Sequence, residues 1–176
     1  LKGQTHYLAE YNKKGTYTHK HTDVCHFKEK GYVVLNKKIR YTFNQDYKIL
    51  TLSYFNSCQQ KQWSKQIKYG VDCCYGNYSN AQIKIKDTVC YVLFSHNNAT
   101  ADVSAYKFGI DGSLIWQKEI SFKDGDVYNF DVHITYDNSL LLTCNESNNF
   151  FTMGKISANG KLQWQNSYKL PGKNNR

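Results

Sequence analysis

Apolar and polar residues alternate through most of this chain, in short segments separated by turn residues. The C-terminal part shows the pattern most clearly, in 131–137 (DVHITYD), 140–146 (LLLTCNE), 150–157 (FFTMGKIS) and 161–169 (KLQWQNSYK). A period of two is typical of a half-buried strand, and a short apolar run between turns is typical of a buried one. The pattern therefore predicts four antiparallel strands joined by short hairpins.

The same order of segments occurs twice more. It is found in 82–87, 89–95, 102–109 and 113–120, and earlier in 25–30, 31–36, 47–55 and 61–69. Two further strands are predicted at 5–11 and 16–22. A four-stranded unit that recurs about every 50 residues is typical of a repeat architecture.

A tryptophan follows a turn glycine by four residues in two of these units. The pairs are Gly112 with Trp116 and Gly160 with Trp164. The dipeptides Asp111-Gly112 and Asn159-Gly160 predict type I′ hairpin turns. Each tryptophan is expected on the same strand face as the residue two before it, Leu114 or Leu162, packing one sheet against the next.

Two other copies are less regular. Trp63 falls in register with the later tryptophans, and in the first copy Gly15 takes the glycine place and His19 the tryptophan place. We expect His19 and the three tryptophans to pack between units, and Gly15 to belong to a turn like those of Gly112 and Gly160. A cage of tryptophans around a ligand is the alternative.

The motif resembles the β-propeller repeats of the SBBP and PQQ-like type. The matching residues are AYKFGIDGSLIWQKEI and MGKISANGKLQWQNSY, with TLSYFNSCQQKQWSKQI as a degenerate copy. The resemblance implies an all-β, propeller-like fold of about four blades, each a four-stranded antiparallel sheet. It implies nothing about function, because one fold serves many functions.

The expected blades divide a single domain of residues 1–176 into 1–22, 23–69, 70–122 and 123–170. The first would be a half blade that holds only the third and fourth strands. Such a chain could close as an unusual four-bladed ring, belong to a longer propeller, or take strands from another copy. Open sheet edges favour strand addition between subunits, which can close a ring or extend a filament.

Composition agrees with this class. The 176 residues are 40% hydrophobic and include 15 Tyr, 9 Phe and one Pro, which suits one domain of pleated, half-buried strands. No apolar run is long enough to cross a membrane, and the first residues, LKGQTHYLAEYN, lack the features of a signal peptide. We therefore expect a soluble protein without membrane insertion.

Three sequons and six cysteines favour a secreted, glycosylated and disulfide-bonded protein. The sequon asparagines are Asn77, Asn98 and Asn145, and the cysteines are Cys25, Cys58, Cys73, Cys74, Cys90 and Cys144. Six cysteines allow 15 pairings. A staple from Cys25 to Cys73 or Cys74 is expected, because these residues fall in equivalent loops, whereas Cys90 and Cys144 are not expected to pair with each other.

Two polar clusters contain residue types that bind metal ions. His19, His21 and His26, with Cys25, could surround zinc or copper, but no metal-binding spacing frames them. The second cluster, Asp124, Asp126, Asn129 and Asp131, lacks the ligand spacing of a calcium loop. An outer strand with its linking loop, and a solvated linker, are the favoured interpretations.

Neither catalysis nor nucleic-acid binding is expected. The sequence has no glycine-rich phosphate loop, nucleophile elbow or carboxylate pair, so neither enzymatic activity nor a cofactor is predicted. The net charge of +9 comes mainly from dispersed lysines, and Arg40 and Arg176 are the only arginines. A diffuse basic surface would attract acidic glycans, cell-surface proteins or an acidic face of another copy.

The sequence therefore predicts a non-enzymatic extracellular module with a structural or adhesive role, which polymerises with copies of itself by strand exchange into fibres or surface assemblies. The alternatives are a lectin-like or protein-binding propeller and a fragment of a larger propeller protein.

Overall fold

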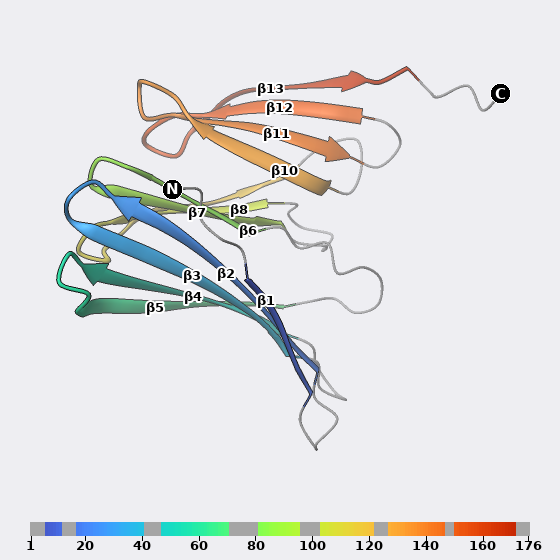
Figure 1. Cartoon of the computed structure of the whole chain (residues 1–176). Coiled ribbons are helices and arrows are strands. Elements are labelled where there is room, and N and C mark those ends of the chain that lie inside the picture. Colours follow the sequence, from blue (N-terminus) through green and yellow to red (C-terminus); the bar gives the residue numbers. More distant parts are fainter. Residues whose placement is uncertain are drawn as a thin grey trace. The chain divides into compact units, whose positions relative to one another are not determined.

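The computed structural model describes residues 6–11, 17–40, 47–70, 81–95, 103–121, 127–146 and 150–171. In these ranges all regular structure is β-strand (Figure 1), which confirms the all-β prediction. No helix in this part of the chain could span a membrane. The strands form one five-stranded sheet and two four-stranded sheets, and in each sheet consecutive strands are neighbours.

The chain forms two compact units. The first unit comprises Leu1–Tyr75, Ile85–Tyr91 and Lys107–Ile115, and the second comprises Gly76–Lys84, Val92–Tyr106 and Trp116–Arg176. The first unit holds the five-stranded sheet and the second holds the C-terminal four-stranded sheet. The residues of the central sheet are shared between the two.

The five-stranded sheet of the first unit is an antiparallel meander. Its strands are β1 (His6–Tyr11), β2 (Tyr17–Phe27), β3 (Gly31–Arg40), β4 (Tyr47–Asn56) and β5 (Lys61–Gly70). Here the structure differs from the expected half blade of residues 1–22. Strand β2 is one strand where two were expected, and it pairs with β3 without a break from Thr18↔Arg40 to Phe27↔Gly31.

The continuity of β2 has a simple physical reason. Residues 22–27 (TDVCHF) contain neither glycine nor proline to end a strand. Thr22 and Val24 are β-branched, which favours extended backbone. The turn comes only at residues 28–30, where Lys30 N donates to Phe27 O at 3.2 Å. Strand β1 is therefore the fifth strand of this sheet and not part of a separate one.

One face of this sheet is buried. Val33, Leu35, Leu52 and Tyr54 lie opposite one another across β3 and β4 and are at most 7% exposed. A fully buried leucine contributes roughly 1.5–3 kcal/mol relative to an exposed one. The Tyr54 hydroxyl donates to Lys30 O at 2.7 Å, which ties this face to the β2–β3 turn.

The central sheet contains β6 (Ala81–Lys86), β7 (Val89–Ser95), β8 (Val103–Gly109) and β9 (Leu114–Ile120). Strand β7 has the bounds predicted from its apolar run and is buried from Cys90 to Ser95. A strand buried on both faces is expected to be continuously apolar, which explains the loss of alternation here.

The C-terminal sheet contains β10 (Val127–Ile134), β11 (Leu140–Glu146), β12 (Phe150–Ile156) and β13 (Leu162–Lys169). Strands β11, β12 and β13 follow the predicted segments closely, whereas β10 begins four residues before the predicted segment 131–137 and ends three residues before its end. On one face, Val132, Leu142 and Gly154 are paired in a row and all are buried or nearly so. The opposite face is half-exposed.

The tight turns before β9 and β13 were predicted to be type I′. They are instead type I turns followed by a single left-handed residue. Gly112 (φ 82°) and Gly160 (φ 83°) have positive φ, whereas Asp111 and Asn159 are not among the residues that do. Gly160 N donates to Ser157 O, and Ser157 N donates to Lys161 O. This loop, which contains a G1 bulge, needs positive φ at one residue only. The single glycine of each turn supplies it.

Candidate protein-interaction site

In the first unit, the indole of Trp63 on β5 contacts the turn between β8 and β9. Trp63 Nε1 donates a hydrogen bond to Ile110 O at 2.7 Å. The ring lies against Gly112, since a Cβ built on that glycine would be 2.9 Å from Trp63 Cδ2. The carbonyl and the glycine are two residues apart, so a single turn holds both the edge and the face of the indole.

The second unit contains the same contact between other residues. Trp116 Nε1 on β9 donates to Ala158 O at 3.0 Å. A Cβ on Gly160 would be 3.0 Å from Trp116 Cδ2. Glycine is required in both turns for two reasons: its φ is left-handed, and a side chain there would overlap the ring.

Trp164 occupies the same backbone position in the third sheet. Trp63 pairs with Tyr54 and Trp164 pairs with Lys155, and in both strand pairs the register shifts at the next residue toward the turn. The shift leaves Gln62 and Gln163 as extra residues of β-bulges. Because of the bulge, Leu162 does not alternate regularly with Trp164, and the simple two-residue face argument does not hold here.

Unlike the other two indoles, Trp164 neither donates a hydrogen bond to a turn of the described ranges nor faces a turn glycine there. It is 39% exposed, and no hydrogen bond or ring contact joins it to any residue there. Tyr168 lies four residues on along β13 and is 53% exposed. Phe151 and Met153 are half-buried and lie directly opposite Tyr168 and Asn166. We call these four side chains, Trp164, Tyr168, Phe151 and Met153, the β13 surface, because cross-strand partners share a sheet face.

The equivalent face of the five-stranded sheet is covered. Tyr54, opposite Trp63, is 7% exposed, and Leu52, one alternation further along β4, is fully buried. The corresponding residues of the C-terminal sheet are Lys155 and Met153, both half-exposed. The β13 surface is thus the counterpart of a face that is buried elsewhere in this protein.

A third turn has the same backbone as the two that hold indoles. Asn56 N donates to Gln60 O and Gln59 N donates to Asn56 O, as in the turns of Gly112 and Gly160. The left-handed residue is Gln59 (φ 63°), and residues 57–60 are all exposed. Gln59 carries the Cβ that the two glycines lack, so an indole cannot approach this turn in the same way.

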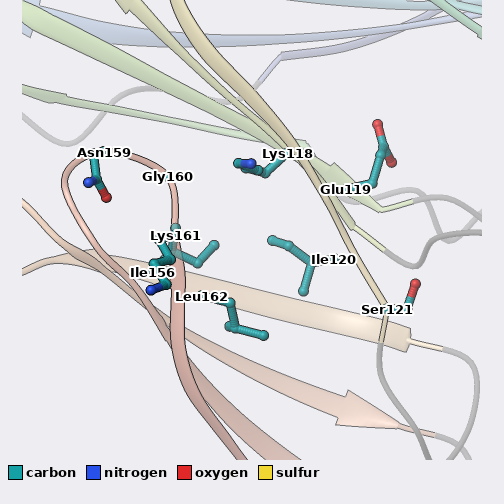
Figure 2. Close-up of a pocket in the computed structure, with 9 residues that line it drawn as sticks. All are labelled: Lys118, Glu119, Ile120, Ser121, Ile156, Asn159, Gly160, Lys161 and Leu162. Atoms are coloured by element: carbon teal, nitrogen blue, oxygen red, sulfur yellow. The ribbon is translucent and has the colours of Figure 1, made fainter.

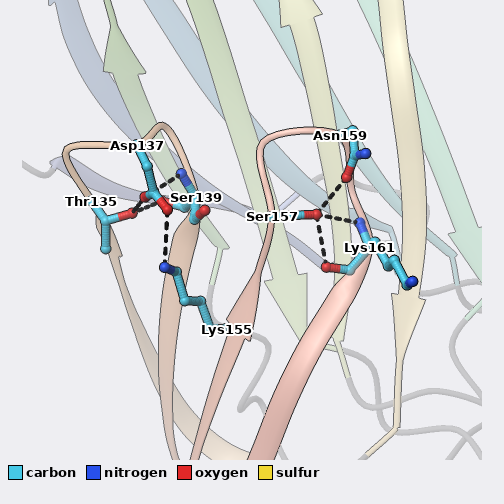
Figure 3. A network of polar contacts seen from close by, with 7 residues as sticks. All are labelled: Thr135, Asp137, Ser139, Lys155, Ser157, Asn159 and Lys161. Carbon is cyan, nitrogen blue, oxygen red and sulfur yellow. Dashed lines mark hydrogen bonds and ion pairs between the residues drawn. The ribbon is translucent and has the colours of Figure 1, made fainter.

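Polar side chains hold the turns of the C-terminal sheet in shape (Figure 3). The Thr135 hydroxyl hydrogen lies between two acceptors, the Asp137 carboxylate and Ser139 O, and Lys155 Nζ lies 3.0 Å from Asp137 Oδ2. Ser157 and Asn159 make the corresponding hydroxyl contact in the other turn. The Thr135 hydrogen bond, and then Lys155, hold the pKa of Asp137 below its usual range. Lys155, directly opposite Trp164, is thereby fixed.

Two cavities of the second unit have polar groups in their walls. One of about 430 Å³ lies next to the Trp116 contact, with Lys118, Lys161 and Ile120 in its wall (Figure 2). Its one carboxylate, that of Glu119, accepts a hydrogen bond from Ser104 Oγ at 2.7 Å. This cavity is therefore open and has both charged and apolar side chains in its wall, beside the packed Trp116 indole.

The other cavity, of about 310 Å³, is lined by Gln82, Asp131 and Thr143, among others. Gln82 Nε2 donates to Phe130 O at 2.8 Å, and Gln82 Oε1 is buried without a partner among the described residues. A water molecule would satisfy this oxygen. Asp131 is exposed and lies 3.9 Å from Lys84 Nζ.

The cysteines and sequons are only partly within the described ranges. No disulfide joins cysteines there. Cys25 is half-buried, Cys58 is exposed, and Cys90 and Cys144 are buried. Burial, and then the nearby Cys25, raise the pKa of Cys90. Asn145 is exposed at the end of β11. Cys73, Cys74, Asn77 and Asn98 lie outside the described residues, so the predicted staple stays a prediction.

The candidate metal ligands form no cluster within the described ranges. His26 is exposed, with its ring 5.8 Å from that of Tyr32. No three His, Cys, Asp or Glu side chains in these ranges gather as a metal site. The remaining candidates fall outside the ranges or have side chains that do: Gly15, His19, His21, Asp124, Asp126 and Asn129.

Sequence reasoning missed the role of Gln59 and the exposure of Trp164, which was itself expected to pack between units. Gln59 carried no predicted role, although it stands at the place of Gly112 and Gly160, four residues before a tryptophan. The presence of glutamine where the other two copies have glycine could have identified Gln59 from the sequence. The exposure of Trp164 was not expected, because Leu162 and Gln165 repeat the Leu114 and Gln117 that flank Trp116.

Comparison with protein-family models, with curated proteins and with solved structures gives no match to this chain.

Proposed function

We propose that this chain is a non-enzymatic structural module of the β-propeller type, which binds a protein partner through the β13 surface. The observation that carries the proposal is the state of the third indole. Trp63 and Trp116 each hold a turn of another sheet, whereas Trp164, at a bulged position that matches that of Trp63, holds none of the described turns.

The physical basis is the free energy of burying aromatic surface. Tryptophan and tyrosine bury large areas and supply a hydrogen-bond donor, so exposed pairs of them are favoured at protein interfaces. They stand beside Met153 and Phe151 of β12, in a sheet whose β10–β11 turn is held by the Asp137 contacts and whose β12–β13 turn is held by the Ser157 contacts. A rigid surface loses little entropy on binding.

An extracellular setting is part of the proposal. It is supported by the sequons, of which Asn145 is exposed, and by the six cysteines. The intact mass of the secreted protein, with and without deglycosylation and with and without reduction, tests it. A mass equal to that of the unmodified, fully reduced chain would contradict it.

A chain in which residues 127–170 are repeated once after Leu170 tests the interaction. The added sheet offers the first Trp164 a turn identical to the one that holds Trp116. If the β13 surface is built to bind such a sheet, the added copy unfolds together with the rest, and exchange of the Trp164 Nε1 proton slows. The same chain with Trp164→Ala in the first copy is the control. Separate unfolding of the added sheet, with Trp164 still exposed, would contradict the proposal.

A further inference from the structure

The structure assigns a specific kind of partner to Trp164: we infer that this indole binds a β-hairpin turn of another protein, in which a left-handed glycine follows the accepting carbonyl by two residues. The inference rests on the proposed function and names the chemistry of its partner.

The two filled contacts define what an indole of this protein binds. In one, Ile110 O accepts the Nε1 proton and Gly112 faces the ring. In the other, Ala158 O and Gly160 play the same parts. The residues between carbonyl and glycine differ, Asp111 in one case and Asn159 in the other, so the backbone of the turn and the missing Cβ are what the contacts share.

Trp164 has the backbone geometry to make this contact. Its bulge and register match those of Trp63. The two sites differ in charge: Lys65, two residues after Trp63, helps lower the pKa of Asp111 after the larger effect of its hydrogen bonds with Ser113. The residue two after Trp164 is the uncharged Asn166. We therefore expect Trp164 to select the glycine turn by shape, without requiring an acidic residue in it.

A second copy of this chain does not offer such a turn among its described residues. Its Gly112 and Gly160 already face Trp63 and Trp116. Its exposed turn at residues 56–60 carries Gln59, and the corresponding turn at 135–139 carries Asn138, both at positive φ. A Cβ at that place would approach an indole to about 3 Å, closer than packed atoms allow. Because no described turn of a second copy fits Trp164, we take the partner to be a different protein.

The experiment uses the full chain carrying 15N-labelled tryptophan and a backbone-cyclised hairpin peptide with the sequence ISANGKL, that of Ile156–Leu162. The control peptide has alanine in place of the glycine. We expect the glycine peptide to shift the Trp164 Nε1–H resonance saturably and to leave those of Trp63 and Trp116 unchanged. The alanine peptide should bind at least tenfold more weakly, and Trp164→Phe should abolish the shift.

Each other outcome overturns the inference in a distinct way. Equal shifts with both peptides would show that glycine is not selected, while the β13 surface of the proposed function stands. No shift with either peptide, although the chain with the repeated sheet buries Trp164, would show that a sheet and not a turn is bound. Self-association of the wild type in sedimentation velocity, lost in Trp164→Phe, would show that the occupant is a second copy.

Discussion

A Cβ atom placed on Gly160 would lie 3.0 Å from Cδ2 of Trp116, whose Nε1 donates to the carbonyl of Ala158 two residues earlier. The contact therefore depends both on the backbone shape of the turn and on the absence of a side chain at its glycine. The same relationship holds between Gly112 and Trp63. Stability, partner choice and tolerance to substitution should all follow from it.

Gly160→Ala should destabilise the protein by about 2–4 kcal/mol, because it adds a left-handed non-glycine residue and an overlap with the indole. Urea unfolding monitored by circular dichroism measures the loss. Gly154→Ala is the matched control. Gly154 lies on β12 with ordinary room, 3.6 Å to the nearest atom, and its replacement should change the unfolding free energy by less than about 1 kcal/mol. Equal losses from the two would contradict the role of the turn.

Gln59→Gly should stabilise the protein by about 0.5–1 kcal/mol. Gln59 is held at a φ of 63°, which glycine adopts without the steric cost that other residues incur. Glycine also raises the conformational entropy of the unfolded chain, which offsets part of this stabilisation. Ser57→Gly, at another exposed position of the same turn, should instead be neutral or slightly destabilising. Thermal unfolding of the two variants compares them, and a lower midpoint for Gln59→Gly than for the wild type would refute this account.

Trp116→Phe should cost about 1–3 kcal/mol, since it removes the donor to Ala158 O and part of a packed ring. Trp164→Phe should cost no more than about 0.5 kcal/mol, because the indole is exposed and lacks a partner in the described ranges. The pair compares an indole that a turn covers with one that no described turn covers. Similar losses in chemical denaturation would mean that Trp164 is covered in solution.

The unfolding free energy should fall as the pH rises above 9.0, the ordinary pKa of the Cys90 thiol. Burial raises this pKa in the folded state, so the unfolded chain ionises first and stability present below pH 9.0 is lost above it, at up to about 1.4 kcal/mol per pH unit. Between about pH 9 and 10, Cys90→Ala should show a shallower loss than the wild type.

Other buried groups also titrate at alkaline pH. Burial also raises the pKa of Tyr91 and Tyr106 above their ordinary value of 10.0, so these residues add a loss of the same sign only above pH 10. Burial lowers the pKa of Lys107, which acts in the opposite direction in both variants and cancels in the difference. Parallel pH profiles for wild type and Cys90→Ala would contradict the prediction.

Much of the fold could be predicted because the pattern of polar and apolar residues is local. Strands β7 and β11 coincide with the predicted segments, since each is an apolar run between turn residues. The extent of β2 was not predicted: residues 22–27 contain no residue that ends a strand, but the length of the strand also depends on its pairing with β3. The bulges at Gln62 and Gln163 likewise arise from pairing.

The candidate site could be predicted only in outline. The spacing of glycine and tryptophan identifies a residue suited to packing, but the same spacing occurs at Trp116, which is held by a turn, and at Trp164, which no described turn holds. Trp116 and Trp164 differ in whether a turn of another sheet lies against the indole, and the sequence around each tryptophan does not show this. The meaning of Gln59 depends in the same way on knowing that its counterparts face an indole.

The left-handed glutamine also bears on how a chain of this kind could change in length over time. Duplication of a C-terminal repeat would place a ready glycine turn against Trp164 and need no accompanying substitution. Duplication ahead of the five-stranded sheet would bring a new indole against Gln59 and would need that residue to mutate first. Addition of a repeat would therefore need fewer substitutions after the C-terminal sheet than before the five-stranded one, and one side chain makes the difference.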